Sequence, residues 1–182
     1  MKSLKMYCFS LSPKNLDKIK AMNYTPVGLG KEKFDNNWLT DDTGNNISNK
    51  NSWYGENTFY YWLWKNNLKQ NFDAEWIGFC HYRRFWNNNN AKKNNEEFRK
   101  SIVSDAPKEW NNYDVVLRDE IFVNSTKLSK IWKHGKKQLL VNPFVFFSKK
   151  KMTVKVHYDM YHGFGEMDQA IELLDNENRN DL

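Results

Sequence analysis

A histidine and two arginines directly follow a strongly apolar segment, and they are the residues of this chain best suited to chemistry. Residues 76–82 read W-I-G-F-C-H-Y, which is typical of a buried β-strand, and His81, Arg83 and Arg84 stand at its end. Because burying an unpaired charge is costly, we expect these side chains at the mouth of a sheet. Ligands bind there in open α/β sheets, and the planar guanidinium group suits phosphate. The segment therefore predicts an anion site.

Two other interpretations of these residues stay open. If the strand continues past its apolar part, Arg83 points to the same face as His81 and Arg84 to the opposite face. One arginine could then bind phosphate while the other pairs with Glu56 or Asp73. In the ordinary alternative, one arginine pairs with a carboxylate, the other is solvated, and the histidine is structural.

A polar loop that leads into a helix forms the second group of candidates. Residues 45–58 read N-N-I-S-N-K-N-S-W-Y-G-E-N-T and contain Lys50, Tyr54, Glu56 and Thr58. The first turn of a helix presents free backbone N–H groups and the positive end of its dipole, and both suit phosphate. Glu56 also has an ordinary explanation, because an acidic residue stabilises a helix start by about 0.3–1 kcal/mol.

The third group lies in residues 158–168, Y-D-M-Y-H-G-F-G-E-M-D, with Asp159, His162, Glu166 and Asp168. His162 and Glu166 are four residues apart, so on one helix they would share a face as metal ligands or as an acid/base pair. The two glycines between them weaken that geometry. Nucleophile-elbow and P-loop motifs are absent, and Gly28-x-Gly30 lacks the third glycine of a dinucleotide fingerprint.

Size and composition favour one globular domain, residues 1–182. Apolar residues make up 40% of the chain and aromatic residues 16%, which argues against disorder despite a mean hydropathy of −0.87. The net charge of +6 and the pI near 9.1 suit an anionic partner such as a nucleotide, nucleic acid or membrane surface. Cys8 and Cys80 lie in apolar runs without metal-ligand spacing, so we expect buried, reduced thiols.

Strands alternate with helices along the chain, which predicts an α/β domain with a mostly parallel central sheet. Residues 35–52 and 87–95 are polar and predict loops, and the run around Pro143 at 142–148 fits either a strand or a buried turn. The expected strands are residues 4–10, 24–30, 76–82 (the central one) and 114–117, and the expected helices are 15–22, 54–68, 96–103, 125–133 and 155–174, the last interrupted near its glycines.

Two blocks of the chain together resemble a known family. Residues 46–66 and 76–86 carry the ordered pattern K…Y-x-E-x-T…W-x-W-K-N…H-Y-R-R. This pattern resembles a bacterial glycosyltransferase family whose members carry a domain catalogued as of unknown function and are tied to capsular and exopolysaccharide synthesis. Residues 161–174 look like the family's later helix with its histidine and aspartate, here His162 and Asp168.

The resemblance implies a GT-A-like, Rossmann-type fold that uses a nucleotide-sugar donor, in the first instance a UDP-sugar, and a glycan acceptor. It implies Lys50, Tyr54, Thr58, His162 and Asp168 as donor contacts. Glu56 or His81 would be the base, and Arg83 or Arg84 would stabilise the leaving diphosphate. In GT-A enzymes an Asp-x-Asp motif commonly follows the corresponding strand and holds a metal. Residues 81–84 replace it, so we expect no metal ligands among these residues, and the use of a divalent metal stays open.

Family members usually continue beyond the helix at 161–174, which implies that acceptor-side structure is missing here. The chain shows no hydrophobic signal core and no apolar run near the ~20 residues that cross a bilayer, so we expect a cytoplasmic protein, with peripheral contact at the inner face of the membrane left open.

Two rival functions stay open: a nucleic-acid or polyanion-binding module, and an inactive relative that keeps the sugar-nucleotide pocket. We expect no nucleic-acid partner, because the aromatic residues of 54–68 follow the spacing of a helix packed on a core.

Overall fold

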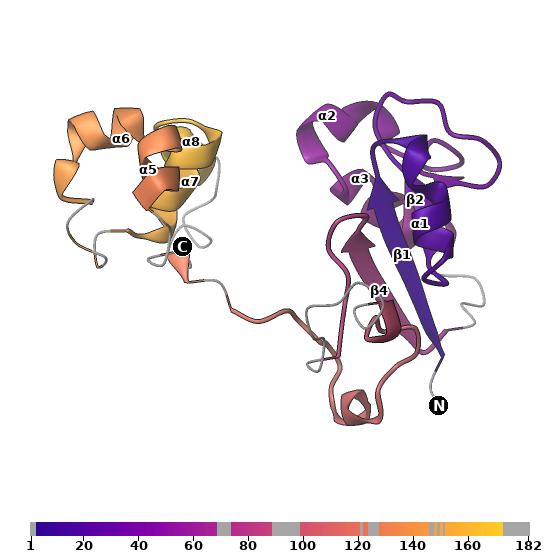
Figure 1. Cartoon of the computed structure of the whole chain (residues 1–182). Coiled ribbons are helices and arrows are strands. Elements are labelled where there is room, and N and C mark those ends of the chain that lie inside the picture. The colour runs from indigo at the N-terminus through magenta and orange to yellow at the C-terminus, as the bar shows by residue number, and fades with distance from the viewer. Residues whose placement is uncertain are drawn as a thin grey trace. The chain divides into compact units, whose positions relative to one another are not determined.

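A computed structural model of the whole chain shows how these segments are arranged (Figure 1). The structure describes residues 3–68, 74–88, 99–120, 122–123, 128–145, 148, 150 and 152–172. The chain divides into two compact units, residues 1–116 and 117–182, which we call the N-terminal and the C-terminal unit. Each unit has a hydrophobic core of its own.

A four-stranded sheet forms the centre of the N-terminal unit. Its strands are β1 (Leu4–Ser10), β2 (Thr25–Gly28), β3 (Leu39–Thr40) and β4 (Trp76–His81), and they lie in the order β3-β2-β1-β4. The pairings β1–β2, β1–β4 and β2–β3 are all parallel. The predicted α/β class, with a Rossmann-like parallel sheet flanked by helices, is confirmed.

The register brings the ends of all four strands to the same border of the sheet. Ser10 is paired with Gly28, Gly28 with Thr40, and Phe9 with His81. We call this border, formed by Ser10, Gly28, Thr40 and His81, the carboxyl edge. Residues that directly follow these strands are therefore neighbours in space although they are far apart in the sequence.

Helix α3 (Asn57–Asn66) covers one face of the sheet. Side chains of a strand alternate between the two faces, so Tyr7 and Phe9 of β1 point to the same side. There they pack with Phe59, Trp62 and Leu63 of α3 in one buried cluster. The ring of Phe59 lies 5.2 Å from that of Tyr7 and 5.4 Å from that of Phe9. This aromatic contact fixes α3 on the sheet.

The opposite face is covered by α1 (Leu16–Lys20) and by the segment after β4. Met6 and Cys8 point to this side and share a buried cluster with Ile19 of α1 and with Tyr24. The Tyr24 hydroxyl donates a hydrogen bond of 2.6 Å to the backbone carbonyl of Val103. The sheet is thus enclosed between two layers, as both clusters require.

Shorter elements complete the two units. The remaining elements of the N-terminal unit are η1 (Pro13–Asn15), η2 (Ser48–Lys50), α2 (Asn51–Tyr54) and η3 (Lys108–Asn112). The C-terminal unit contains α5 (Leu128–His134), α6 (Lys136–Val141), η5 (Pro143–Val145), α7 (Val154–His162) and α8 (Glu166–Glu172) around Ile131, Met152 and Met160.

Most of the predicted elements are confirmed. The strands at 4–10 and 24–30, the helices at 15–22 and 54–68, and the helix that starts within 125–133 all appear, although residues 125–127 lie outside the described part. The helix predicted at 155–174 is interrupted as expected, because Gly163 and Gly165 have φ angles of +149° and +83°. At 142–148 the structure has a short 3-10 turn, η5, rather than a strand. The loop predicted at 35–52 also contains β3 and η2.

Two expectations about strands are wrong, and one about a helix is confirmed only in part. The strand at 76–82 was expected at the centre, but β4 is the outermost of the described strands beside β1. Residues 114–117 form no strand, since no neighbouring strand pairs with them and Val115 and Leu117 are 65% and 80% exposed. The helix expected at 96–103 is present at residues 99–100. It does not extend to Ile102, which pairs with Asn87 in a β-bridge, and residues 96–98 lie outside the described part.

Replacing Phe59 with alanine should lower the free energy of unfolding by about 3–5 kcal/mol, because truncating a fully buried ring leaves a cavity. Urea denaturation followed by circular dichroism measures this loss. Trp53→Ala is the control, since its ring is 86% exposed and its removal should change stability by less than about 0.5 kcal/mol. Similar losses in the two variants would contradict the packing of α3 on the sheet.

Candidate functional site

The carboxyl edge contains the position where ligands bind in sheets of this topology. From β1 the chain continues to β2 on one side, whereas β4 lies on the other side of β1. The order of the strands therefore reverses between β1 and β4, and the crevice outside such a reversal is the usual binding place in open α/β sheets. Polar side chains from four segments gather along this edge.

Glu56 and His81 form a pair at this reversal point. Glu56 precedes α3, His81 ends β4, and His81 Nε2 lies 2.9 Å from Glu56 Oε2. Their side chains are 42% and 34% exposed, so solvent and small ligands reach both groups. A pair this exposed contributes little to stability. The pair instead orients the imidazole ring of His81, because the Glu56 carboxylate holds the ring in one position.

Arg83 and Arg84 follow in a tight turn that ends the strand. The Arg84 amide donates to the His81 carbonyl at 2.8 Å, and the His81 amide donates to the Arg84 carbonyl at 3.2 Å. The strand therefore ends at His81, and Arg83 and Arg84 do not alternate between the two faces of the sheet. Both guanidinium groups are exposed, Arg83 lies 5.1 Å from the centre of the Tyr82 ring, and no carboxylate in the described part of the chain pairs with either arginine. Glu56 pairs with His81 instead, and Asp73 lies outside the described residues.

The loop before α3 is held by a small hydrogen-bond network. The Asn51 amide donates to the Gly55 carbonyl at 2.9 Å and to Thr58 Oγ1 at 3.1 Å. The Thr58 hydroxyl donates to the same carbonyl at 3.0 Å. Gly55 has φ +54°, a conformation that favours glycine, so the chain reverses here and delivers Glu56 to the edge.

The residues of this loop that were predicted to contact the nucleotide-sugar donor differ in their exposure to solvent. Lys50 and Tyr54 are exposed beside the edge, and Tyr54 is 52% exposed. Thr58 is fully buried, and its hydroxyl is engaged with Asn51 and Gly55. Thr58 therefore positions the loop, and its direct contact with a ligand stays a prediction. Asn51 was missed from the sequence, because one Asn among many polar residues gave no signal.

Asp41 is a second residue that the sequence did not reveal. It follows β3 directly, is only 4% exposed, and its Oδ2 atom has no hydrogen-bond partner. Burial raises the pKa of its carboxyl group, and the neighbouring Thr58 hydroxyl opposes that shift. In the sequence Asp41 stands in a polar stretch, L-T-D-D-T-G, that resembles surface loop. The burial arises because β3, only two residues long, carries it into the sheet border.

Two cysteines lie next to each other behind this edge. Cys8 of β1 is paired in register with Cys80 of β4, and both thiols are free. A hydrogen bond with Cys8 and burial raise the pKa of Cys80. Since the thiolate is the reactive form, a raised pKa indicates a packing role. Cys8 is buried as expected, whereas Cys80 is only half-buried.

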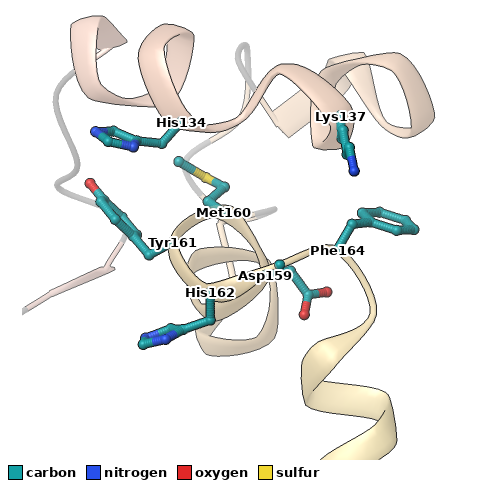
Figure 2. Close-up of a pocket in the computed structure, with 8 residues that line it drawn as sticks. His134, Lys137, Asp159, Met160, Tyr161, His162 and Phe164 are labelled. Atoms are coloured by element: carbon teal, nitrogen blue, oxygen red, sulfur yellow. The ribbon is translucent and has the colours of Figure 1, made fainter. Parts of the chain in front are cut away.

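The C-terminal unit contains the last two predicted contacts with the nucleotide-sugar donor, His162 and Asp168, and an open cavity of about 240 Å³ (Figure 2). His162 lines this cavity, and its ring stacks 4.3 Å from that of Tyr158. Asp168 accepts from Lys155 at 2.8 Å, and Lys155 also contacts the buried Asp159 at 3.0 Å. Asp168 and then Asp159 raise the pKa of Lys155. The pair with Asp168 connects α7 to α8, whereas the pair with Asp159 lies within α7.

Two glycines lie between His162 and Glu166, which the sequence suggested as a possible metal-binding or acid/base pair. His162 ends α7 and Glu166 begins α8, so they do not share a helix face as the four-residue spacing allowed. Neither unit, within the described residues, contains a group of three or more His, Cys, Asp or Glu side chains that could hold a metal ion. The roles of His162 and Asp168 as donor contacts stay predictions.

Comparison with known proteins identifies the family. The model of a family described as a domain of unknown function (DUF4422) matches residues 7–180. The chain belongs to this family. No curated protein and no solved structure matches the chain. The match covers nearly all of both units. The family's description assigns it no activity, so the glycosyltransferase assignment stays a prediction. The prediction of a single domain over residues 1–182 also stays a prediction.

None of the described helices of this DUF4422 chain is both long enough and apolar enough to cross a membrane. The longest, α3, has ten residues and carries polar groups at both ends.

Replacing Asp41 with asparagine should stabilise the protein at pH 7 by about 1–3 kcal/mol, because it removes a buried carboxylate whose Oδ2 atom has no hydrogen-bond partner. The effect should depend on pH. A carboxyl group with a raised folded pKa gives its full stability below its unfolded pKa of about 3.9 and loses it as pH rises through the folded pKa. Thermal melts should therefore show similar Tm values near pH 4 and a gap that opens toward pH 7.

Asp42→Asn is the matched control for this experiment. Asp42 is exposed and accepts a hydrogen bond of 2.6 Å from the Thr40 hydroxyl. Its replacement should give no stabilisation that grows with pH. An Asp41→Asn protein less stable than the wild type at pH 7 would show that the carboxylate is satisfied within the fold.

Proposed function

We propose that this protein is a glycosyltransferase that transfers a sugar from a nucleotide-sugar donor to a hydroxyl group of a polysaccharide or lipid-linked glycan. The observation that carries the proposal is the Glu56–His81 pair, 2.9 Å apart at the reversal of strand order. A turn with two exposed arginines adjoins this pair. An acid/base group beside unpaired cations is what transfer from a diphosphate leaving group needs. The resemblance of the two sequence blocks supports the same activity.

His81, oriented by Glu56, acts as the base in this proposal. When Glu56 accepts a hydrogen bond from Nε2–H, the lone pair of the imidazole lies on Nδ1. No hydrogen bond from the described residues occupies that nitrogen. Nδ1 then removes the proton from the acceptor hydroxyl as its oxygen attacks the sugar carbon. The bond from that carbon to the diphosphate breaks, and the diphosphate leaves with the electron pair.

Arg83 and Arg84 stabilise the charge that develops on the diphosphate. Guanidinium groups bind phosphate through two parallel hydrogen bonds. Lys50, at the end of η2, adds a further exposed cation, and Tyr54 is an exposed ring beside it. A divalent metal is compatible with these residues, and turnover measured with and without Mn²⁺ decides whether it is used.

The acceptor determines where the reaction takes place. A cytoplasmic nucleotide-sugar pool and a lipid-linked acceptor would bring the protein to the inner face of the membrane, without a membrane-spanning helix. Nucleic-acid binding is less favoured, because Phe59 and Trp62 of the aromatic helix are buried in the core rather than offered for stacking. Calorimetry with UDP and with single-stranded DNA separates the two. Steeply salt-dependent DNA binding without nucleotide binding would favour the alternative.

The primary test is donor turnover by the wild-type chain across a panel of nucleotide sugars. In the best donor reaction, Glu56→Gln should lower kcat by about 10²–10⁴-fold, the usual contribution of general acid–base catalysis. KM should change little, because the pair acts in the chemical step. Glu75→Gln is the control, since exposed Glu75 precedes β4 at the opposite border of the sheet. No nucleotide binding and no turnover with any donor would refute the proposal.

Arg83→Ala and Arg84→Ala should each reduce kcat/KM by at least about 10²-fold, comparable to the loss of one oxyanion-stabilising donor. Both side chains are exposed, so Tm should stay within a few degrees of the wild-type value. Lys108→Ala removes an exposed cation from η3 and should leave turnover unchanged. Activity within a few-fold of the wild type in both arginine variants would exclude them from the reaction.

A further inference from the structure

The C-terminal unit exposes more large apolar side chains than its core contains. The core cluster consists of three buried residues, Ile131, Met152 and Met160. Exposed apolar surface of unusual extent is typical of a region that binds a protein or a membrane. Nine large apolar side chains are exposed among the described residues of this unit: Leu117, Phe122, Trp132, Leu140, Val141, Phe144, Val154, Tyr161 and Phe164.

Three of these side chains lie where α6 is followed by η5. Leu140 and Val141 end α6, and Phe144 belongs to η5. The three residues lie within five positions of the chain and are all exposed, Leu140 by as much as 86%. We call Leu140, Val141 and Phe144 the apolar tip. They cannot be explained as part of the core of the unit, because each of them faces solvent.

The chain around the apolar tip is basic. Residues 121–158 include nine lysines but no aspartate, glutamate or arginine. Lys130 and Lys133 of α5 and Lys136 of α6 are exposed, and none of them pairs with a carboxylate in the part of the chain that the structure describes. Lys136 and Leu140 are four residues apart on one helix, so the lysine lies one turn from the tip. Positive charge therefore lies beside the exposed apolar side chains.

We propose that the C-terminal unit binds the surface of an anionic lipid bilayer through the apolar tip together with Lys130, Lys133 and Lys136. The apolar side chains enter the boundary between headgroups and acyl chains, while the ammonium groups stay with the lipid phosphates. Trp132 suits the same depth, because its exposed ring has an apolar body and a polar N–H group. It is exposed since it lies about 100° around α5 from the buried Ile131.

The composition of this region favours a bilayer over an acidic protein. Protein interfaces are enriched in arginine, which forms directed pairs with carboxylates, and depleted in lysine. Residues 121–158 show the reverse pattern. Lysine is a flexible point charge, which suits the diffuse negative charge of a lipid surface. The inference goes beyond the proposed function and does not depend on it. In the proposed reaction the contact would hold the protein beside a lipid-linked acceptor.

Sedimentation of the whole chain with lipid vesicles tests the contribution of the lysines. The wild type should bind mixed phosphatidylcholine and phosphatidylserine vesicles at least about 10-fold more tightly than phosphatidylcholine vesicles. The triple variant Lys130→Gln, Lys133→Gln, Lys136→Gln should weaken this binding by about 10–100-fold, since each lysine at an anionic surface contributes about five-fold. The matched control is Lys14→Gln, Lys31→Gln, Lys33→Gln, which removes the same charge from exposed lysines of the N-terminal unit and should bind within about two-fold of the wild type.

A second arm tests the apolar tip. The double variant Leu140→Ser, Val141→Ser should bind the mixed vesicles about 10-fold or more weakly, because it loses the side chains that enter the bilayer. Its Tm should stay within a few degrees of the wild-type value, since both residues are exposed. Tyr113→Ser, Val115→Ser is the control, because it removes two exposed apolar side chains from the N-terminal unit and should bind like the wild type.

Three outcomes would overturn the proposal. The first is a wild type that does not bind the mixed vesicles, and the second is an equal loss of binding in the two lysine variants, which would assign the effect to net charge. The third is unchanged vesicle binding by the tip variant together with equally tight binding of polyglutamate, which would identify an acidic protein as the partner. Donor turnover in solution should be the same in all four variants, so these outcomes leave the proposed function untouched.

Discussion

The parallel pairing of β1 with both β2 and β4 is the constraint on which the N-terminal unit depends. Parallel strands run in the same direction, so every residue that follows a strand is delivered to one border of the sheet. Asp41 and His81 are forty residues apart in the sequence, yet both reach this border because each follows or ends a strand. Antiparallel pairing of β4 would place His81 and the two arginines at the opposite border, away from the start of α3.

Burial of the aromatic face of α3 converts this border into a defined site. Phe59, Trp62 and Leu63 are almost fully enclosed against β1, which fixes the position and rotation of the helix. Rotation of an α-helix by one residue moves a side chain by about 100°, so the core contacts also determine where the first turn points. Glu56 therefore meets His81 through packing that is energetically large, whereas their own exposed ion pair contributes little.

Sequence patterns predicted the parts of this structure that depend on local periodicity. The apolar run in residues 4–10 and the helical spacing of aromatics in residues 54–68 identified β1 and α3, and Gly163 and Gly165 marked the break between α7 and α8. The contact of Glu56 with His81 was not predicted, because it depends on which strands are neighbours. β4 was expected at the centre, and it lies outermost among the described strands because its partner is β1 alone.

The same limit explains why Asp41 and Asn51 escaped notice. Each is a polar residue in a polar stretch, and only the two-residue strand β3 and the turn at Gly55 determine that one is buried and the other bridges a loop. Residues 114–117 show the opposite error. Their composition is typical of a strand, but a strand needs a neighbour, and without one Val115 and Leu117 remain exposed.

Exposure of both arginines is consistent with a site that receives a doubly charged phosphate group. Two adjacent guanidinium groups repel each other, and burying them without a counter-ion would cost more than their packing could return. In water both charges are screened, and Arg83 rests its side chain on the Tyr82 ring at low cost. A bound diphosphate would supply the missing negative charge and displace water from the same turn.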